Sequence, residues 1–161
     1  MRRTALAIFA LTAALGASAV ASADPPAPQD STPCTSELAG VMTWPADELT
    51  PLVCAGERWH ALTSPAPPND RWLSVGPAIT VHGEGMRNPE VASGQWTGTP
   101  QEPDSQCRAE QQTVVSPGVK SAPQVSEGEP GQPLSLQLLP SLFSVELSGY
   151  CLWTRTTPQT R

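Results

Sequence analysis

The fold class follows from one stretch, Phe143-Ser144-Val145-Glu146-Leu147-Ser148-Gly149-Tyr150-Cys151-Leu152-Trp153. Large apolar side chains recur there at every second position, the period of a β-strand with one buried face. The predicted buried face holds Phe143, Val145, Leu147, Cys151 and Trp153, and Glu146 lies on the more exposed opposite face. Since this is the longest alternating run in the chain, we expect a central strand.

Shorter strand candidates precede this run. Pro140-Ser141 separates the run from Leu134–Leu138 by a hairpin-like distance, and Gly76-Pro77 suggests a bend within one edge-like strand. The chain has 19 Pro, which leave few uninterrupted helices, and the helix start signal at Ser36–Met42 is too short to be stable alone. The other candidates are Arg58–Leu62, Trp72–Val75, Ala78–His82, Val91–Thr97 and Arg108–Val115. The sequence therefore predicts a mainly β fold, a small antiparallel sandwich or partly open barrel.

The N-terminus has the pattern of a secretory signal peptide over residues 1–23. Arg2 and Arg3 precede an apolar run without charge, and Ala21-Ser22-Ala23 supplies the small residues of a cleavage site. An uncleaved anchor is the less favoured alternative. We expect a secreted, extracellular or cell-envelope protein that begins at Asp24, with a Pro-rich flexible leader over 24–33 and a single disulfide-bonded β domain over 34–161. No later stretch approaches the roughly 20 apolar residues that cross a bilayer.

Four cysteines are present, Cys34, Cys54, Cys107 and Cys151. An even count in an exported chain predicts two disulfides, and the absence of any Cys-x-x-Cys pair argues against zinc. Three pairings are open. We favour Cys34–Cys54, which would tie the N-terminal segment to the body, and Cys107–Cys151, which would join two strands.

The charge pattern argues against nucleic acid as a partner. The chain carries a formal net charge of −6, and after Arg2 and Arg3 its Lys and Arg residues are scattered singly. Nucleic-acid binding depends on clustered cations that neutralise phosphates.

Catalytic and metal sites are poorly supplied. His82 and Glu84 would share a strand face and could together hold a metal, but Gly83 and Gly85 favour a solvent-facing turn. His60 lies three residues after Glu57, a spacing that suits a helix better than the strand predicted there. There is no Gly-x-Ser-x-Gly elbow, and the acidic residues lie mostly in loops. We therefore expect no catalytic residue, no metal and no cofactor.

The candidate recognition residues are Arg87, Asn88 and Trp44. Arg87 and Asn88 belong to the distinctive loop Gly83–Pro89, although a plain turn is the more ordinary interpretation. Trp59, Trp72, Trp96 and Trp153 fall within strand candidates and are expected in the core, whereas Trp44 lies next to Pro45 outside them. Trp44 is therefore the tryptophan we expect to be exposed.

Three stretches resemble small exported proteins of mycobacteria and related actinobacteria, together with the Ala-rich signal and the Pro-rich leader. They are 69–77 (NDRWLSVGP), 122–128 (APQVSEG) and 147–153 (LSGYCLW). The resemblance covers most of the mature chain and implies an extracellular or envelope location, but no active-site residue. The sequence thus favours a non-catalytic binding or structural protein with an unknown envelope or extracellular partner. The alternatives are a secreted hydrolase that uses carboxylates or His82, and an extracellular protein-interaction or inhibitor module.

Overall fold

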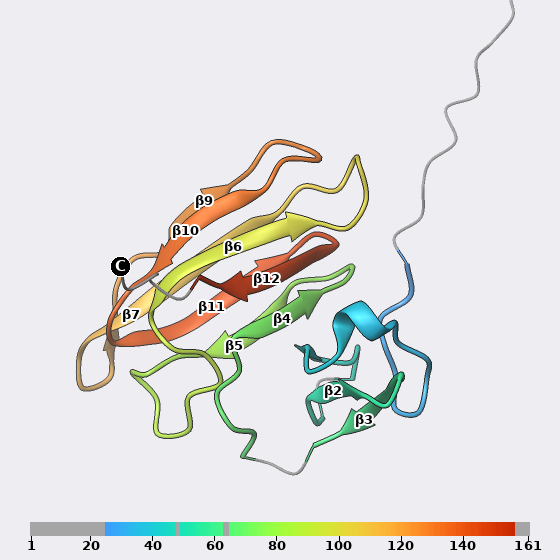
Figure 1. The fold of residues 1–161 in the computed structure, drawn as a ribbon. Helices are drawn as coiled ribbons and strands as arrows, with labels where there is room; N and C mark the ends of the chain where they lie inside the picture. The colour runs from blue at the N-terminus through green and yellow to red at the C-terminus, as the bar shows by residue number, and fades with distance from the viewer. Residues whose placement is uncertain (1–24, 48, 63–64, 157–161) are drawn as a thin grey trace, which may run out of the picture.

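The computed structural model describes residues 25–47, 49–62 and 65–156. The predicted signal peptide, residues 1–23, lies outside them. The described chain is built from strands and one short 3-10 helix, η1, at Ser36–Leu38, which confirms the predicted mainly β class (Figure 1). The strands are β1 Met42–Thr43, β2 Leu52–Ala55, β3 Arg58–Ala61, β4 Arg71–Ser74, β5 Ile79–His82, β6 Gly94–Pro100, β7 Arg108–Ser116, β8 Val119–Lys120, β9 Gln124–Glu127, β10 Leu134–Leu138, β11 Leu142–Ser148 and β12 Cys151–Arg155. No helix in the described part of the chain is long and apolar enough to cross a bilayer.

The strands form two sheets. The larger sheet has the order β10-β6-β12-β4-β1-β2-β3, and the smaller has β5-β11-β7-β8, with β9 also paired to β7. All pairs are antiparallel except β1 and β4, which run parallel at Met42 and Trp72. In Figure 1, β2 and β3 lie to one side of the two main layers.

The main core lies between the two sheets. Trp72 and Trp153 of the larger sheet and Val145 of the smaller sheet are all completely buried there. The disulfide Cys107–Cys151 joins the chain just before β7 to the first residue of β12, so it links the two sheets through this core. The sandwich and the predicted pairing are both confirmed.

The predicted central strand 143–153 is two strands in different sheets. β11 belongs to the smaller sheet and β12 to the larger one, and the chain crosses between them at Gly149. Gly149 has φ +83°, and a Cβ there would collide with the carbonyl oxygen of Gln106. The crossing takes two residues, so Val145, Leu147, Cys151 and Trp153 all face the core, as predicted. The prediction is wrong for Phe143, because the register of β11 shifts between Leu142 and Ser144, which buries Leu142 completely and leaves Phe143 half-buried.

Two further predicted connections are wrong for the same reason. The stretches on either side of Gly76-Pro77 are not one bent strand, because β4 lies in the larger sheet and β5 in the smaller. Likewise, β10 and β11 form no hairpin, because β10 pairs with β6. In each case the chain reverses at a residue with positive φ, Gly76 at +67° and Ser141 at +59°, which carries it to the other sheet.

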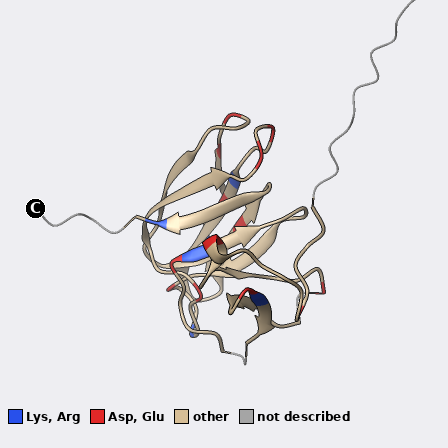
Figure 2. Ribbon diagram, turned by 45° about the vertical axis from the view of Figure 1, so that its right-hand side comes forward, with Lys and Arg blue, Asp and Glu red and all other residues tan. Residues whose placement is uncertain are grey.

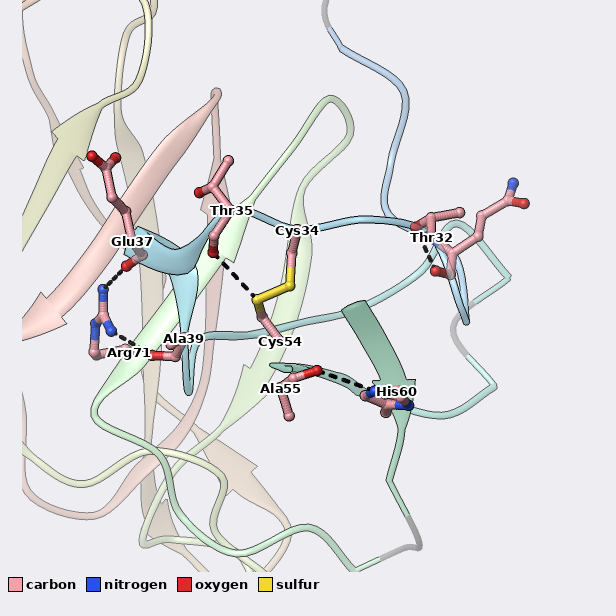
Figure 3. Close-up of a disulfide and its surroundings, with 10 residues drawn as sticks. Thr32, Cys34, Thr35, Glu37, Ala39, Cys54, Ala55, His60 and Arg71 are labelled. Atoms are coloured by element: carbon pink, nitrogen blue, oxygen red, sulfur yellow. Dashed lines mark hydrogen bonds between the residues drawn. A yellow bond between two sulfur atoms is a disulfide. The ribbon is translucent and has the colours of Figure 1, made fainter. Parts of the chain in front are cut away.

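The outer face of the larger sheet has its own apolar cluster. It holds Val41, Leu52, Cys54, Trp59, Leu73 and Val75. Cys34 and Leu38 of the N-terminal segment pack against it, and the disulfide Cys34–Cys54 holds them there (Figure 3). Arg71 supports the same segment by donating to the carbonyls of Ala39 and Glu37 at 2.7 and 2.8 Å.

The end of the predicted leader pairs with the edge strand β3. Ser31 N donates to Trp59 O at 2.7 Å, and Trp59 N donates to Thr32 O at 2.9 Å. Asp30 accepts from the backbone N–H of Ala61 at 3.0 Å. These bonds satisfy backbone groups of an edge that would otherwise be open to pairing with another chain.

Candidate functional site

The predicted recognition loop Gly83–Pro89 leaves the end of β5 and returns to the same point. His82 O accepts from the backbone N–H groups of Glu90 at 2.8 Å and Val91 at 3.1 Å. The loop is therefore closed at its base, and its exposed tip, which carries Met86, Arg87 and Asn88, projects from a fixed frame.

The two glycines of the loop are needed because the loop runs close to the start of β11. Gly85 N donates to Leu142 O at 2.7 Å, and a Cβ on Gly85 would lie 2.6 Å from Ser141 O. A Cβ on Gly83 would overlap the side chain of Leu142. The Gly-x-Gly pattern thus reports a close backbone approach, in agreement with the turn interpretation.

A buried carboxylate holds His82 at the foot of the loop. Glu90 is only 7% exposed, and its Oε2 lies 3.0 Å from His82 Nδ1 and accepts the His82 backbone N–H at 2.8 Å. The hydrogen bond from His82 to Glu90 raises the pKa of the imidazole above its usual value, although partial burial opposes the shift. The other side of the ring meets Phe143 edge-on, with centroids 6.3 Å apart.

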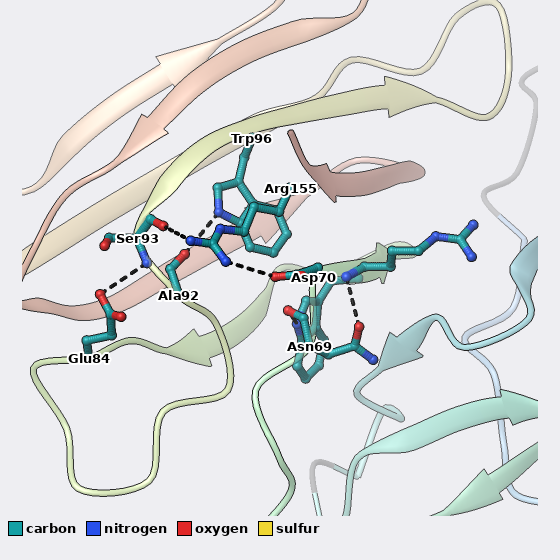
Figure 4. A network of polar contacts seen from close by, with 9 residues as sticks. Asn69, Asp70, Glu84, Ala92, Ser93, Trp96 and Arg155 are labelled. Atoms are coloured by element: carbon teal, nitrogen blue, oxygen red, sulfur yellow. Dashed lines mark hydrogen bonds and ion pairs between the residues drawn. The ribbon is translucent and has the colours of Figure 1, made fainter. Parts of the chain in front are cut away.

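A second polar network fixes Ser93, in the segment that leads from the recognition loop to β6 (Figure 4). Arg155 donates to Ser93 O at 2.9 Å and pairs with Asp70 at 3.4 Å. Glu84 accepts from Ser93 N at 3.2 Å. Hydrogen bonding by Ser93, first from its side chain and then from its backbone N–H, lowers the pKa of the Glu84 carboxyl. Glu84 therefore turns toward Ser93, while His82 pairs with Glu90.

One hollow brings together all three predicted recognition residues. We name it the Trp44 hollow. It has a volume of about 310 Å³ and is lined by Trp44, Pro65, Ala66, His82, Met86, Arg87, Asn88 and Glu90. Trp44 is half-buried, the least buried of the five tryptophans, and its indole N–H is buried without an acceptor in the described part of the chain.

A second hollow shares Met86 with the first. We name it the Lys120 hollow. It has a volume of about 440 Å³ and is lined by Gly85, Met86, Val114, Ser116, Pro117, Gly118, Val119, Lys120 and Phe143. Both volumes fall within the range of small-molecule sites, about 300–1,000 Å³.

The cations divide into two groups. Six Lys or Arg residues lie in the described ranges, scattered along the ribbon in Figure 2. Four bond protein oxygens: Arg58, Arg71, Arg108 and Arg155. For Arg87 and Lys120 the described residues provide no hydrogen bond and no ion pair, and one lines each hollow. Each of the two hollows that share Met86 is thus lined by one cation that no described residue pairs, in a chain of net charge −6.

The other residues considered from sequence do not converge here. His60 lies on β3, where Nε2 is 3.1 Å from Ala55 O. Among the described residues, no group of three or more His, Cys, Asp or Glu side chains is placed to hold a metal ion. The four cysteines are all in disulfides, which places them in structural roles.

Sequence reasoning missed the Lys120 hollow and the contribution of Pro65 and Ala66. The hairpin β7–β8 that forms one wall carries exposed Val115 and Val119, at 66% and 51%. In the sequence, these valines on either side of the turn Pro117-Gly118 were the feature that could have indicated an apolar surface here.

Comparisons with family models, with curated proteins and with solved structures found no match for this chain.

Proposed function

We propose that this chain is an exported, non-catalytic binding protein of the extracellular space or cell envelope, and that it holds a small anionic ligand in the Trp44 hollow. Two disulfides are typical of an oxidising compartment, and the signal-like N-terminus and the resemblance to small exported actinobacterial proteins support export.

The observation that carries the binding site is the convergence of Trp44, Arg87 and Asn88. They come from segments more than forty positions apart and line one hollow together with His82. An aromatic face supplies apolar contact, and an amide and a cation without a protein partner fix a polar group. Since the lining holds one buried acid already bonded to His82, Arg87 gives the hollow its preference for an anion.

The alternative of a hydrolase depends on the pair His82 and Glu90. Glu90 accepts both the ring and the backbone N–H of His82 through one oxygen, so its bonds close the loop at its base. A two-carboxylate mechanism needs a second acid facing the same space. Glu84 points to Ser93. The geometry therefore favours binding over hydrolysis.

An NMR titration of ¹⁵N-labelled protein with benzoate tests the proposal. Benzoate combines a flat ring with a carboxylate, and benzyl alcohol is its uncharged match. We expect benzoate to shift the Trp44 indole signal and the Arg87 and Asn88 amides at millimolar concentration, and benzyl alcohol to shift them less. Arg87→Gln should abolish the difference between the two probes, and Trp44→Phe identifies the indole signal.

Shifts that map to another surface, or none up to tens of millimolar benzoate, would overturn the proposed site. Release of product from ester or glycoside substrates that stops in His82→Asn would favour the hydrolase instead. A protein partner whose binding is lost in Met86→Ser but which leaves the Trp44 indole signal unmoved would favour the interaction module.

A further inference from the structure

We propose that the Lys120 hollow is a second binding site, specific for a free single-chain carboxylate amphiphile such as a medium-chain fatty acid. This site does not depend on the Trp44 hollow, because Met86 is the one lining residue that they share.

The walls of the hollow suit an alkyl chain. Met86, Val114, Val119 and Phe143 contribute apolar side chains from the recognition loop, β7, β8 and β11. Met86 is 38% exposed and Val119 is 51% exposed, so a bound chain would remove their apolar surface from water.

The rim of the hollow suits a carboxylate. Lys120 is the single lysine of the chain, and its Nζ lies 4.5 Å above the centroid of the Phe143 ring. The aromatic contact places the ammonium group over the apolar wall while leaving its outer side open to an anion. A ligand with a carboxylate at one end and an alkyl chain at the other would meet both features.

The hollow is preformed by backbone contacts. Val114 N donates to Ser141 O, and Gly85 N donates to Leu142 O, at 2.9 and 2.7 Å. These bonds attach both β7 and the loop to the start of β11. Because these main-chain hydrogen bonds fix the positions of both walls, ligand binding needs little further ordering of the protein.

The charge balance favours a free amphiphile over a membrane surface. The chain has a net charge of −6, and Lys120 is the only cation lining this hollow. An anionic membrane would repel such a chain, whereas one carboxylate needs one ammonium group.

Calorimetric titration with dodecanoate, below its micelle concentration, tests the inference. We expect saturable binding with one site, and affinity that rises about twofold or more per methylene from octanoate to dodecanoate. Lys120→Gln should weaken binding about fivefold, the value of an exposed ion pair, and should leave binding of uncharged dodecanol unchanged.

Two valines provide a matched pair. Val119→Asn should weaken dodecanoate binding at least about fivefold, while Val125→Asn, at a valine of similar exposure (52%) on β9, should not. Arg87→Gln should leave it unchanged, which separates this site from the Trp44 hollow. Since these side chains are exposed, the variants should fold, as unchanged circular dichroism would confirm.

Absence of binding at 1 mM dodecanoate would overturn the inference. So would equal losses in Val119→Asn and Val125→Asn, or an unchanged affinity in Lys120→Gln. Sedimentation of the protein with phosphatidylcholine vesicles, reduced by Val119→Asn, would assign the surface to a membrane and would also overturn it.

Discussion

The two faces of the larger sheet are stabilised differently. Its inner face packs on a second sheet, and the disulfide on that side joins Cys107 and Cys151, both completely buried. On its outer face a short N-terminal segment packs, and the half-buried Cys34 of this segment is bonded to Cys54. The inner disulfide therefore joins two layers that also pack on each other, whereas the outer disulfide fastens one short segment that Arg71 and backbone bonds to β3 also hold.

The largest difference should come from the inner disulfide. Its 44-residue separation predicts about 4 kcal/mol of stabilisation from loop closure. Replacing Cys107 and Cys151 together by Ala should reduce the free energy of unfolding by at least that amount in urea melts. If the variant melts like the wild type, the two sheets are held by packing alone and the comparison fails.

The outer disulfide should contribute less and act more locally. Its 20-residue separation predicts about 3 kcal/mol. In the variant with Cys34 and Cys54 both replaced by Ala, hydrogen exchange should accelerate first at the amides of Cys34 and Trp59. The Cys34 amide bonds Glu57 O just before β3, and the Trp59 amide of β3 bonds Thr32 O, so both report on the attachment of the N-terminal segment.

Equal acceleration throughout β11 would contradict this separation of the two faces. The inner variant is the matched control, because there the amides of both sheets should lose protection together.

Sequence could predict the buried residues better than the connections. Alternation placed Val145, Leu147 and Trp153 in the core correctly, because a two-residue crossing at Gly149 preserves the parity of inward-facing positions. The same alternation cannot show that the chain changes sheets, since parity is identical for one strand and for two strands facing one core. The positive φ at Gly149 and Ser141 is the physical event that periodicity does not report.

Short strands escaped prediction for a related reason. β1 and β8 have two residues each, too few to show any period, and β9 is largely exposed. Residue type alone pointed to Trp44, Arg87 and Asn88 as candidates, but their convergence on one hollow depends on long-range contacts such as the pairing of β1 with β4. No local pattern encodes that contact.

The alternation within β11 gives a third and smaller effect. Leu147 is 3% exposed near the end of its strand, where the structure relaxes more easily, so Leu147→Ala should lower stability by about 2–3 kcal/mol. Glu146 is exposed on the opposite face, and Glu146→Ala should change it by no more than about 0.5 kcal/mol. Urea melts of the pair measure the difference. A larger loss of stability in Glu146→Ala than in Leu147→Ala would mean that Glu146, and not Leu147, faces the core.

The smallest effect should come from His82 and Glu90, which join β5 to the end of the recognition loop. Because the pKa of His82 is raised in the folded protein, its proton stabilises the fold below the unfolded pKa, about 6.5. That contribution is lost as the pH rises through the folded pKa. It should stay below about 1 kcal/mol, since the side chain of His82 is 39% exposed and solvent screens the pair.

Glu90→Gln isolates this contribution. The amide oxygen still accepts from the backbone N–H of His82, so the loop remains closed while the charge is lost. NMR titration of the His82 ring should show a lower pKa in the variant, and the wild type's extra stability at pH 5 relative to pH 8 should shrink. If the substitution leaves the His82 pKa unchanged, the Glu90 charge does not act on the imidazole, and Glu90 closes the loop only by accepting the backbone N–H of His82. Any pH dependence at the foot of the recognition loop would then come from groups other than the Glu90 charge.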